Sequence, residues 1–235
     1  MSKLNFDAAG QRKYENGVDH CVLFVLASIS AAGVASWGNG VAWNGITTIT
    51  ESPEGGDTNA MYADNIKYAE IASAEDFKAT IEAYTYPDEF AECTGEKELV
   101  ASSGVKIGQQ DRKPFCVAYR TKIGNDLNPN AGYKLHIVYN CLAKPSEKAY
   151  ETINDSPEGM SLSWEVSTTP MPITKEGYTN LKPTAHLVID STKVDAAKLT
   201  QIENALYGTD GEGQAAGIDP HLLTPDAIID ILKAN

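Results

Sequence analysis

The residues that could do chemistry in this chain of 235 residues are four histidines and an excess of carboxylates. His136 and His186 lie in segments with strand-like alternation, where a single histidine is more often a structural residue than a base or a ligand. The sequence contains no H-E-x-x-H, no G-x-S-x-G and no P-loop motif. The glycine run GEGQAAG has no strand before it and so lacks the context of a dinucleotide-binding fingerprint.

The carboxylates occur as close pairs, namely Glu75 with Asp76, Asp88 with Glu89, and Glu96 with Glu98. A glycosidase needs two carboxyl groups facing each other across a cleft. Neighbouring residues of a strand point to opposite faces, so adjacent acids are poor candidates for such a pair. With 32 acidic residues in the chain, solvated surface is the simpler interpretation. We therefore predict no enzyme, no catalytic residue, no cofactor and no metal ligand.

The overall charge narrows the choice of partners. The formal net charge is −13 and the sequence pI is about 4.7, which argues against a nucleic-acid-binding face built from lysine and arginine.

Four cysteines occur without a C-x-x-C pair and predict buried thiols in a reducing cytoplasm. The apolar stretch 21–34 is too short to span a bilayer and has the wrong flanks for a signal peptide, so we expect a buried strand followed by a loop of small residues.

Strand-like segments dominate the chain and are separated by Gly, Pro, Asn and Asp clusters. Seven or more such strands with turns between them predict an antiparallel sandwich or barrel. The clearest loops are 52–59 and 124–132, the second being the extended tip of a hairpin. We expect 73–80 to be extended or to form one loose turn. The strand-like segments are 40–51, 61–71, 79–87, 114–124, 132–143, 159–170 and 183–192.

Helices are few. The best spans 194–208, with Asp195 as its cap and Gly208 at its end, and a terminal helix is predicted over 224–235 with Thr224 as its cap. A short helix is also expected over 146–155. The glycine-rich stretch 208–220 predicts a linker that holds the last helix away from the body or lets it reach a neighbour. We accordingly divide the chain into a β domain, 1–210, and a C-terminal linker with terminal helix, 211–235.

Five aromatic residues leave a binding function open. They could line a sugar-binding groove, as in a carbohydrate-binding β-sandwich, or pack in a core or a subunit interface, which is the more common use of such residues. They are Trp37, Trp43, Tyr84, Tyr86 and Trp164.

Several long blocks of the sequence resemble the major tail protein family of long non-contractile-tailed phages of Gram-positive bacteria. The resemblance covers most of the chain. It is most specific in IKYAEIASAEDFKATIEAYTYPDEFAEC (66–93), IGQQDRKPF (107–115) and INDSPE (153–158). The chain departs from the family pattern at LFVLASISAAGVASWG (23–38), which is more apolar than the corresponding family region.

The resemblance implies a tail tube protein of the virion, mainly β. Its fold would be a two-sheet antiparallel β-sandwich or barrel of the tail tube type, with one flanking helix and a short C-terminal helix. Such subunits form hexameric rings that stack into a hollow tube, assembled in the host cytoplasm. The implied partners are the subunit itself, a tape-measure protein and tail terminator and initiator proteins, with no membrane. DNA passes through the lumen without specific binding, and an acidic lumen would repel its phosphates.

This interpretation assigns roles to particular residues. At the end of the strand in 79–87, we expect Ile81, Ala83 and Thr85 to face the core. The candidate subunit-interface residues are Tyr84, Tyr86, Pro87, Asn125, Asn128, Pro129 and Asn130. The candidate lumen or wet-edge acids are Asp88, Glu89 and Glu92. The loops 52–59 and 124–132, residues 1–17 and the segment after Gly208 are candidates for contact between rings.

Overall fold

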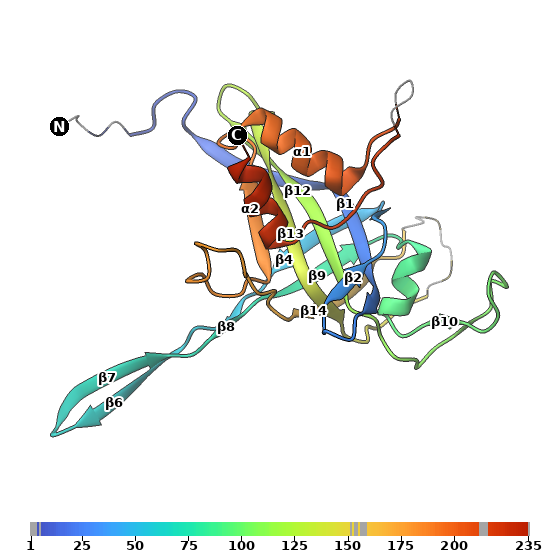
Figure 1. Cartoon of the computed structure of the whole chain (residues 1–235), viewed down its shortest axis with the longest axis horizontal. Helices are drawn as coiled ribbons and strands as arrows, with labels where there is room; N and C mark the ends of the chain where they lie inside the picture. Colours follow the sequence, from blue (N-terminus) through green and yellow to red (C-terminus); the bar gives the residue numbers. More distant parts are fainter. Residues whose placement is uncertain are drawn as a thin grey trace.

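The computed structural model describes residues 4, 6–150, 152, 155, 159–211 and 216–234. It is mainly β, with a large antiparallel sheet, two α-helices and one 3₁₀ helix, η1 (Asp88–Cys93) (Figure 1). The nine strands of the main sheet are β1 (Lys13–Ile29), β2 (Ala35–Trp37), β3 (Val41–Ala42), β4 (Ile46–Glu51), β9 (Lys78–Ala83), β12 (Phe115–Asn125), β13 (Gly132–Ala143), β14 (Leu162–Thr168) and β15 (His186–Asp190).

The main sheet is built around the long hairpin of β12 and β13. Its strand order is β2-β1-β12-β13-β14-β9-β4, with β3 also pairing with β1 and β15 with β13, and every pair is antiparallel. β4, at one end of this path, comes back into contact with β1, so the sheet curls towards closure. The predicted hairpin with its tip at 124–132 is confirmed by this arrangement.

The concave face of the curled sheet encloses an aromatic inner core. Trp43, Phe90 and Trp164 pack in tilted and edge-on contacts with ring centroids 4.3–5.6 Å apart. Such arrangements favour the aromatic quadrupoles over face-to-face stacking. The alternation predicted in 159–170 is confirmed, because Leu162, Trp164 and Val166 are buried and contribute to this core.

The opposite face of the sheet carries a second core, here called the outer core, under the two helices, α1 (Ala196–Tyr207) and α2 (Pro225–Lys233). Leu199, Ile202 and Leu206 of α1 and Ile228 of α2 are buried there. The predicted caps are confirmed: the Asp195 carboxylate accepts hydrogen bonds from two backbone N–H groups and the Thr224 hydroxyl accepts one. The terminal helix is therefore packed on the body beside α1 (Figure 1) and is not held away from it.

The segment predicted as a loop and a single strand, 52–71, is instead part of a two-stranded arm. The arm comprises β5 (Glu54–Gly55) paired with β8 (Glu75–Asp76), and β6 (Thr58–Ala63) paired with β7 (Ile66–Ala72). The chain reverses at Asp64 and Asn65, which both have positive φ, 51° and 62°, as a type I′ turn requires. Figure 1 shows this arm projecting far from the main sheet.

Two further expectations are corrected. The strand predicted over 79–87 ends at Ala83, and Thr85 is exposed and does not face the core. The chain there leaves the sheet to enter η1, with Pro87 at its N-cap. The expected helix over 146–155 is absent from described residues 146–150, which are irregular, while three residues of the segment lie outside the described part. The last short pair is β10 (Lys97–Glu98) with β11 (Lys106–Ile107).

Removing Phe90 should destabilise the whole domain. Its ring is fully buried among Trp43, Trp164 and Phe115. We expect Phe90→Ala to cost about 3–5 kcal/mol in the free energy of unfolding, because a cavity replaces the ring. Urea unfolding followed by tryptophan fluorescence measures this loss. The control, Tyr84→Ala, removes a ring that is 60% exposed and should change stability by about 0.5 kcal/mol or less.

The turn that leads from β15 to α1 should make stability depend on pH. Hydrogen bonds from the Thr192 hydroxyl and backbone N–H, together with Lys193, lower the pKa of Asp190 to about 2. A lowered pKa stabilises the fold above the ordinary value of 3.8, and the contribution is lost as the pH falls towards about 2.

We expect Asp190→Asn to lose about 1 kcal/mol at near-neutral pH, less than the full pKa shift implies because solvent screens the turn, and almost nothing near pH 2, as measured by urea unfolding at both values. Asp111→Asn, with the same change of charge on an exposed residue, is the control. An equal loss for Asp190→Asn at both pH values would show that the carboxylate charge is not what stabilises the turn.

Candidate functional site

The end of β9 separates the two tyrosines that the sequence grouped together. Tyr84 is 60% exposed and projects from the body. Tyr86 is half-buried, lies edge-on to Phe90 and Trp164, and accepts a hydrogen bond from the Lys148 ammonium at 3.2 Å. Of the two, Tyr84 alone offers a free ring to a neighbour, and Tyr86 mainly seals the inner core.

The tryptophans are not arranged as a sugar-binding platform. Trp43 and Trp164 are 2% and 1% exposed, and the Trp43 indole N–H donates to the Thr85 carbonyl at 2.9 Å. Trp37 is half-buried and packs against the outer core. A protein that stacks sugar rings needs exposed aromatic faces, and these three indoles do not provide them.

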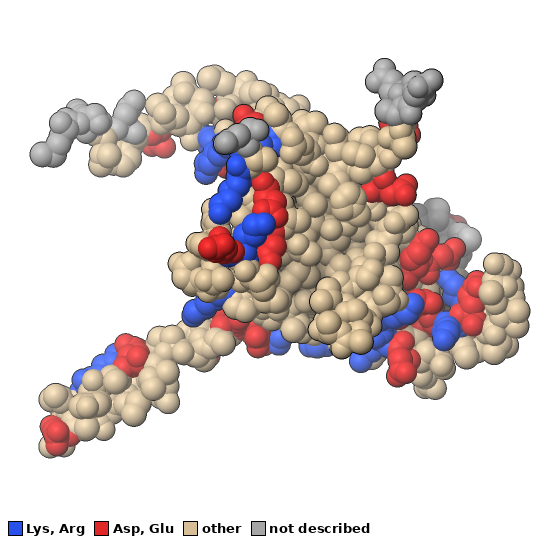
Figure 2. All heavy atoms as spheres, viewed as in Figure 1, with Lys and Arg blue, Asp and Glu red and all other residues tan. Residues whose placement is uncertain are grey.

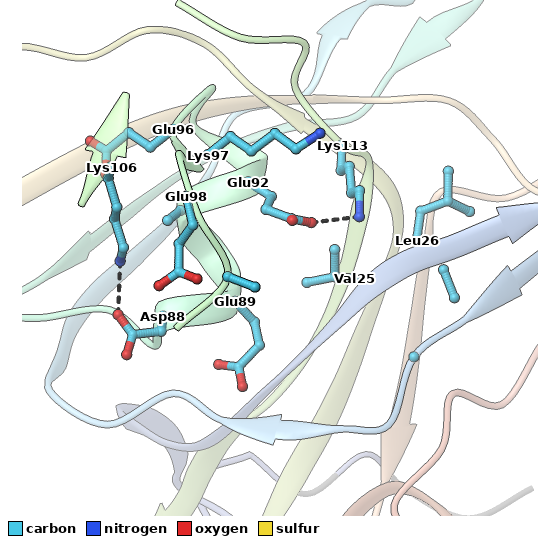
Figure 3. A pocket seen from close by; sticks show the side chains of 14 residues that line it. Val25, Leu26, Asp88, Glu89, Glu92, Glu96, Lys97, Glu98, Lys106 and Lys113 are labelled. Atoms are coloured by element: carbon cyan, nitrogen blue, oxygen red, sulfur yellow. Dashed lines mark hydrogen bonds and ion pairs between the residues drawn. The ribbon is translucent and has the colours of Figure 1, made fainter. Parts of the chain in front are cut away.

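The candidate acids lie on η1, at the rim of a groove of about 740 Å³ between η1, β1 and the β10–β11 hairpin (Figure 3). Asp88 forms an ion pair with Lys106 at 2.8 Å, and Glu92 one with Lys113 at 2.5 Å. The hydrogen bond from Lys106 lowers the pKa of Asp88, so this carboxylate is ionised at neutral pH. Among the described residues Glu89 has no ion pair, and it is exposed.

The groove has more acids than bases. Its charged lining residues are Asp88, Glu89, Glu92, Glu96, Glu98, Lys97, Lys106 and Lys113. The sequence predicted only Asp88, Glu89 and Glu92 as a group. It did not associate Lys106 and Lys113 with them, because these lysines reach the groove through the tertiary fold. Paired acids and lysines at this edge favour a wet surface over a dry binding pocket.

The loop 124–132 is held in shape by its own side chains. The Asn125 side-chain oxygen accepts hydrogen bonds from the backbone N–H groups of Leu127 and Asn128 at 2.9 and 2.6 Å, an Asx-type turn. Asn128 does the same for Asn130 at 2.9 Å. Asn125 is half-buried, whereas Asn128, Pro129 and Asn130 are exposed at a rigid tip.

The arm carries a set of exposed apolar side chains that the sequence does not group. Figure 2 shows its surface as mainly uncharged, with a few acidic and basic groups. Within the described residues, β6 and β7 pair only with each other, so both outer edges of this ribbon are open. The exposed apolar residues are Met61 at 46%, Tyr62 at 73%, Ile66 at 64%, Tyr68 at 71% and Ile71 at 59%.

A glycine fixes the base of the arm. Gly55 has φ 84°, and a Cβ added there would lie 2.3 Å from the Ala74 carbonyl oxygen, closer than any side chain tolerates. The neighbouring Gly56 also has positive φ, 72°, but faces open space. The close approach at Gly55 lets β5 and β8 pair and hold the arm to the body.

The fold and these surfaces define a mainly-β protein with a large antiparallel sheet, a rigid loop tip and a projecting arm. No protein-family model matches the chain, and no curated protein matches it. Among the described residues, no helix combines the length and apolar character that crossing a lipid bilayer requires.

Gly55→Ala should loosen the arm without unfolding the body. The added methyl group clashes with the backbone at Ala74, and an L-residue with positive φ is strained in addition. We expect chymotrypsin to cut at Tyr62 and Tyr68 much faster than in the wild type, with an unchanged urea midpoint for the body. Gly56→Ala is the matched control, since it carries the φ strain without the clash and should be cut at a rate close to that of the wild type.

Proposed function

We propose that the chain is a structural subunit that assembles with copies of itself into stacked rings, as a tail tube protein of the phage major tail protein type. The observation that carries this proposal is the arm, 54–76, with exposed apolar residues on a two-stranded ribbon whose edges are both open. Such a ribbon is only marginally stable in water and gains stability when a partner covers it.

The exposed surface of the whole chain supports the same conclusion. The molecule exposes 15221 Å², whereas a compact monomer of 25.3 kDa exposes about 10,300 Å² by the usual scaling with mass. The excess is several times the area that one partner contributes to a stable interface. Burial of the arm and the loop tips in an assembly would remove part of this excess.

The shape of the monomer favours a repeating assembly over a closed pair. The arm and the groove at η1 lie at different ends of the molecule (Figure 1). A contact between two different surfaces of identical subunits repeats from copy to copy and closes into rings or extends as a filament. We assign the arm to contact between subunits, with Tyr84 and the tip 128–130 as further contact residues.

The excess of acidic residues in the groove at η1 supports a channel through which DNA passes. The acids Asp88, Glu89 and Glu92 are candidates for the lumen wall, together with Glu96 and Glu98 of the same groove. A net negative wall repels phosphates, so a duplex slides without binding. In this proposal the protein has no catalytic role, and its partners are further copies, a tape-measure protein and the proteins that begin and end the tube.

The arm is tested by the triple variant Tyr62→Thr, Tyr68→Thr and Ile71→Thr. Threonine preserves β propensity and removes most of the apolar area. Burying each original side chain is worth about 1.5–3 kcal/mol, so we expect the concentration needed for assembly to rise at least about 100-fold. Light scattering against protein concentration, with negative-stain images of the product, measures the change.

The control is the double variant Tyr150→Thr and Leu181→Thr, which removes side chains 79% and 49% exposed outside the arm. It should assemble at the wild-type concentration. Wild-type assembly by the arm variant would overturn the assignment of the arm, and a monomeric wild type would overturn the proposed function itself.

A further inference from the structure

Three metal-ligating side chains from distant parts of the sequence converge on the concave face of the sheet. They are Glu51 at the end of β4, His136 in β13 and His186 in β15, here called the Glu51 cluster. The His136 Nδ1 atom lies 3.1 Å from His186 Nε2 and 3.4 Å from Glu51 Oε1. The remaining separation, His186 Nε2 to Glu51 Oε1, is 3.7 Å.

These separations match the spacing of ligands around a small cation. Zinc bonds to imidazole nitrogen and carboxylate oxygen are about 2.0–2.2 Å long, which places tetrahedral ligand atoms about 3.3–3.6 Å apart. A point about 2 Å from all three atoms of the Glu51 cluster therefore exists without movement of the backbone. Two histidines and one carboxylate also form a common protein ligand set for zinc, with one position left open.

The Glu51 carboxylate interacts with the two histidines. Within the described part of the chain, no lysine or arginine forms an ion pair with Glu51, so this carboxylate has no competing cation there.

Hydroxyl groups contact two of the three ligands. His136 is 7% exposed, and its other ring nitrogen, Nε2, lies 3.0 Å from the Thr121 hydroxyl. The Tyr119 hydroxyl donates to Glu51 at 2.8 Å. Partners of this kind help to set the tautomer of a metal ligand.

The stacked His136 and His186 rings would have to change their orientation when an ion binds. The His136 and His186 rings are 11° from parallel, with Tyr119 stacked outside the first and Phe77 packed on the second. Both imidazole lone pairs reach one ion only if the rings rotate about their terminal side-chain torsion. Glu51 is 37% exposed, which leaves a path from solvent and room for the fourth ligand.

We propose that the Glu51 cluster binds one divalent transition-metal ion of the zinc class, with water in the fourth position. The ion would join β4, β13 and β15, whose ligands are separated by 85 and 50 residues along the chain. Since binding needs the folded arrangement of all three strands, the ion stabilises the fold. This inference is independent of the proposed assembly.

The test is calorimetric titration of the untagged chain with zinc chloride, together with the visible spectrum of the Co²⁺-loaded protein. We expect one ion per chain and the intense bands of tetrahedral Co²⁺. The double variant His136→Gln and His186→Gln should weaken binding at least about 100-fold, the loss expected when two of three protein ligands are removed. The control, His20→Gln and His221→Gln, removes two exposed histidines elsewhere and should bind as the wild type does.

A second variant covers the case in which the double variant fails to fold. Glu51→Gln keeps the side-chain shape, and its folding is checked by circular dichroism. It should lower zinc affinity and shift the Co²⁺ bands, because a charged oxygen ligand is replaced by an amide. No saturable zinc binding by the wild type, or equal affinity in the wild type and Glu51→Gln, would overturn the proposal and leave the cluster as a hydrogen-bonded network.

Discussion

The hairpin of β12 and β13 is the constraint on which the rest of the structure depends, because its strands are buried on both faces. Phe115, Val117 and Tyr119 face the inner core, and Cys116 and Ala118 face the outer core. A strand buried on both sides needs protein on both sides. The curled ends of the sheet cover one face, and α1 with α2 cover the other, so the body is complete without the arm.

Because the body is complete without the arm, packing of the body does not explain why the arm is present. Residues 54–76 add nothing to either core, yet they keep five large apolar side chains in water. Isolated ribbons of two strands are marginal, and exposed apolar edges are prone to association. In the proposed function, this segment on an already stable body is the surface that other copies cover. The rigid tip at 128–130 and the free ring of Tyr84 extend the same principle to the body.

Local patterns predicted the parts of the fold that local physics controls. The alternation of Leu162, Trp164 and Val166, and the capping residues Asp195 and Thr224, act over a few residues and are visible in the sequence. The arm was missed because Asp64-Asn65 is a weaker turn signal than Asn-Gly, and the segment was interpreted as one strand. The position of the terminal helix could not be predicted either, since it depends on the outer core that Ile228 enters.

The candidate sites also contain some residues that local patterns predict and others that only the tertiary fold brings together. The strand that ends near Tyr84 was visible, but the lysines that pair with Asp88 and Glu92 arrive through the tertiary fold. His136 and His186 each look like isolated strand histidines, and nothing in the sequence associates either of them with Glu51. Register sets the two histidines close together, because His136 lies opposite Val188 and Val138 lies opposite His186 across β13 and β15. Glu51 of β4 reaches them through the curl of the sheet.

Self-assembly is the central claim, and negative-stain electron microscopy of the purified wild-type chain at increasing concentration tests it most directly. The account predicts rings or hollow tubes of uniform diameter, with a growing fraction of assembled protein as the concentration rises. A chain that stays monomeric up to its solubility limit, with the arm intact by mass, would contradict it.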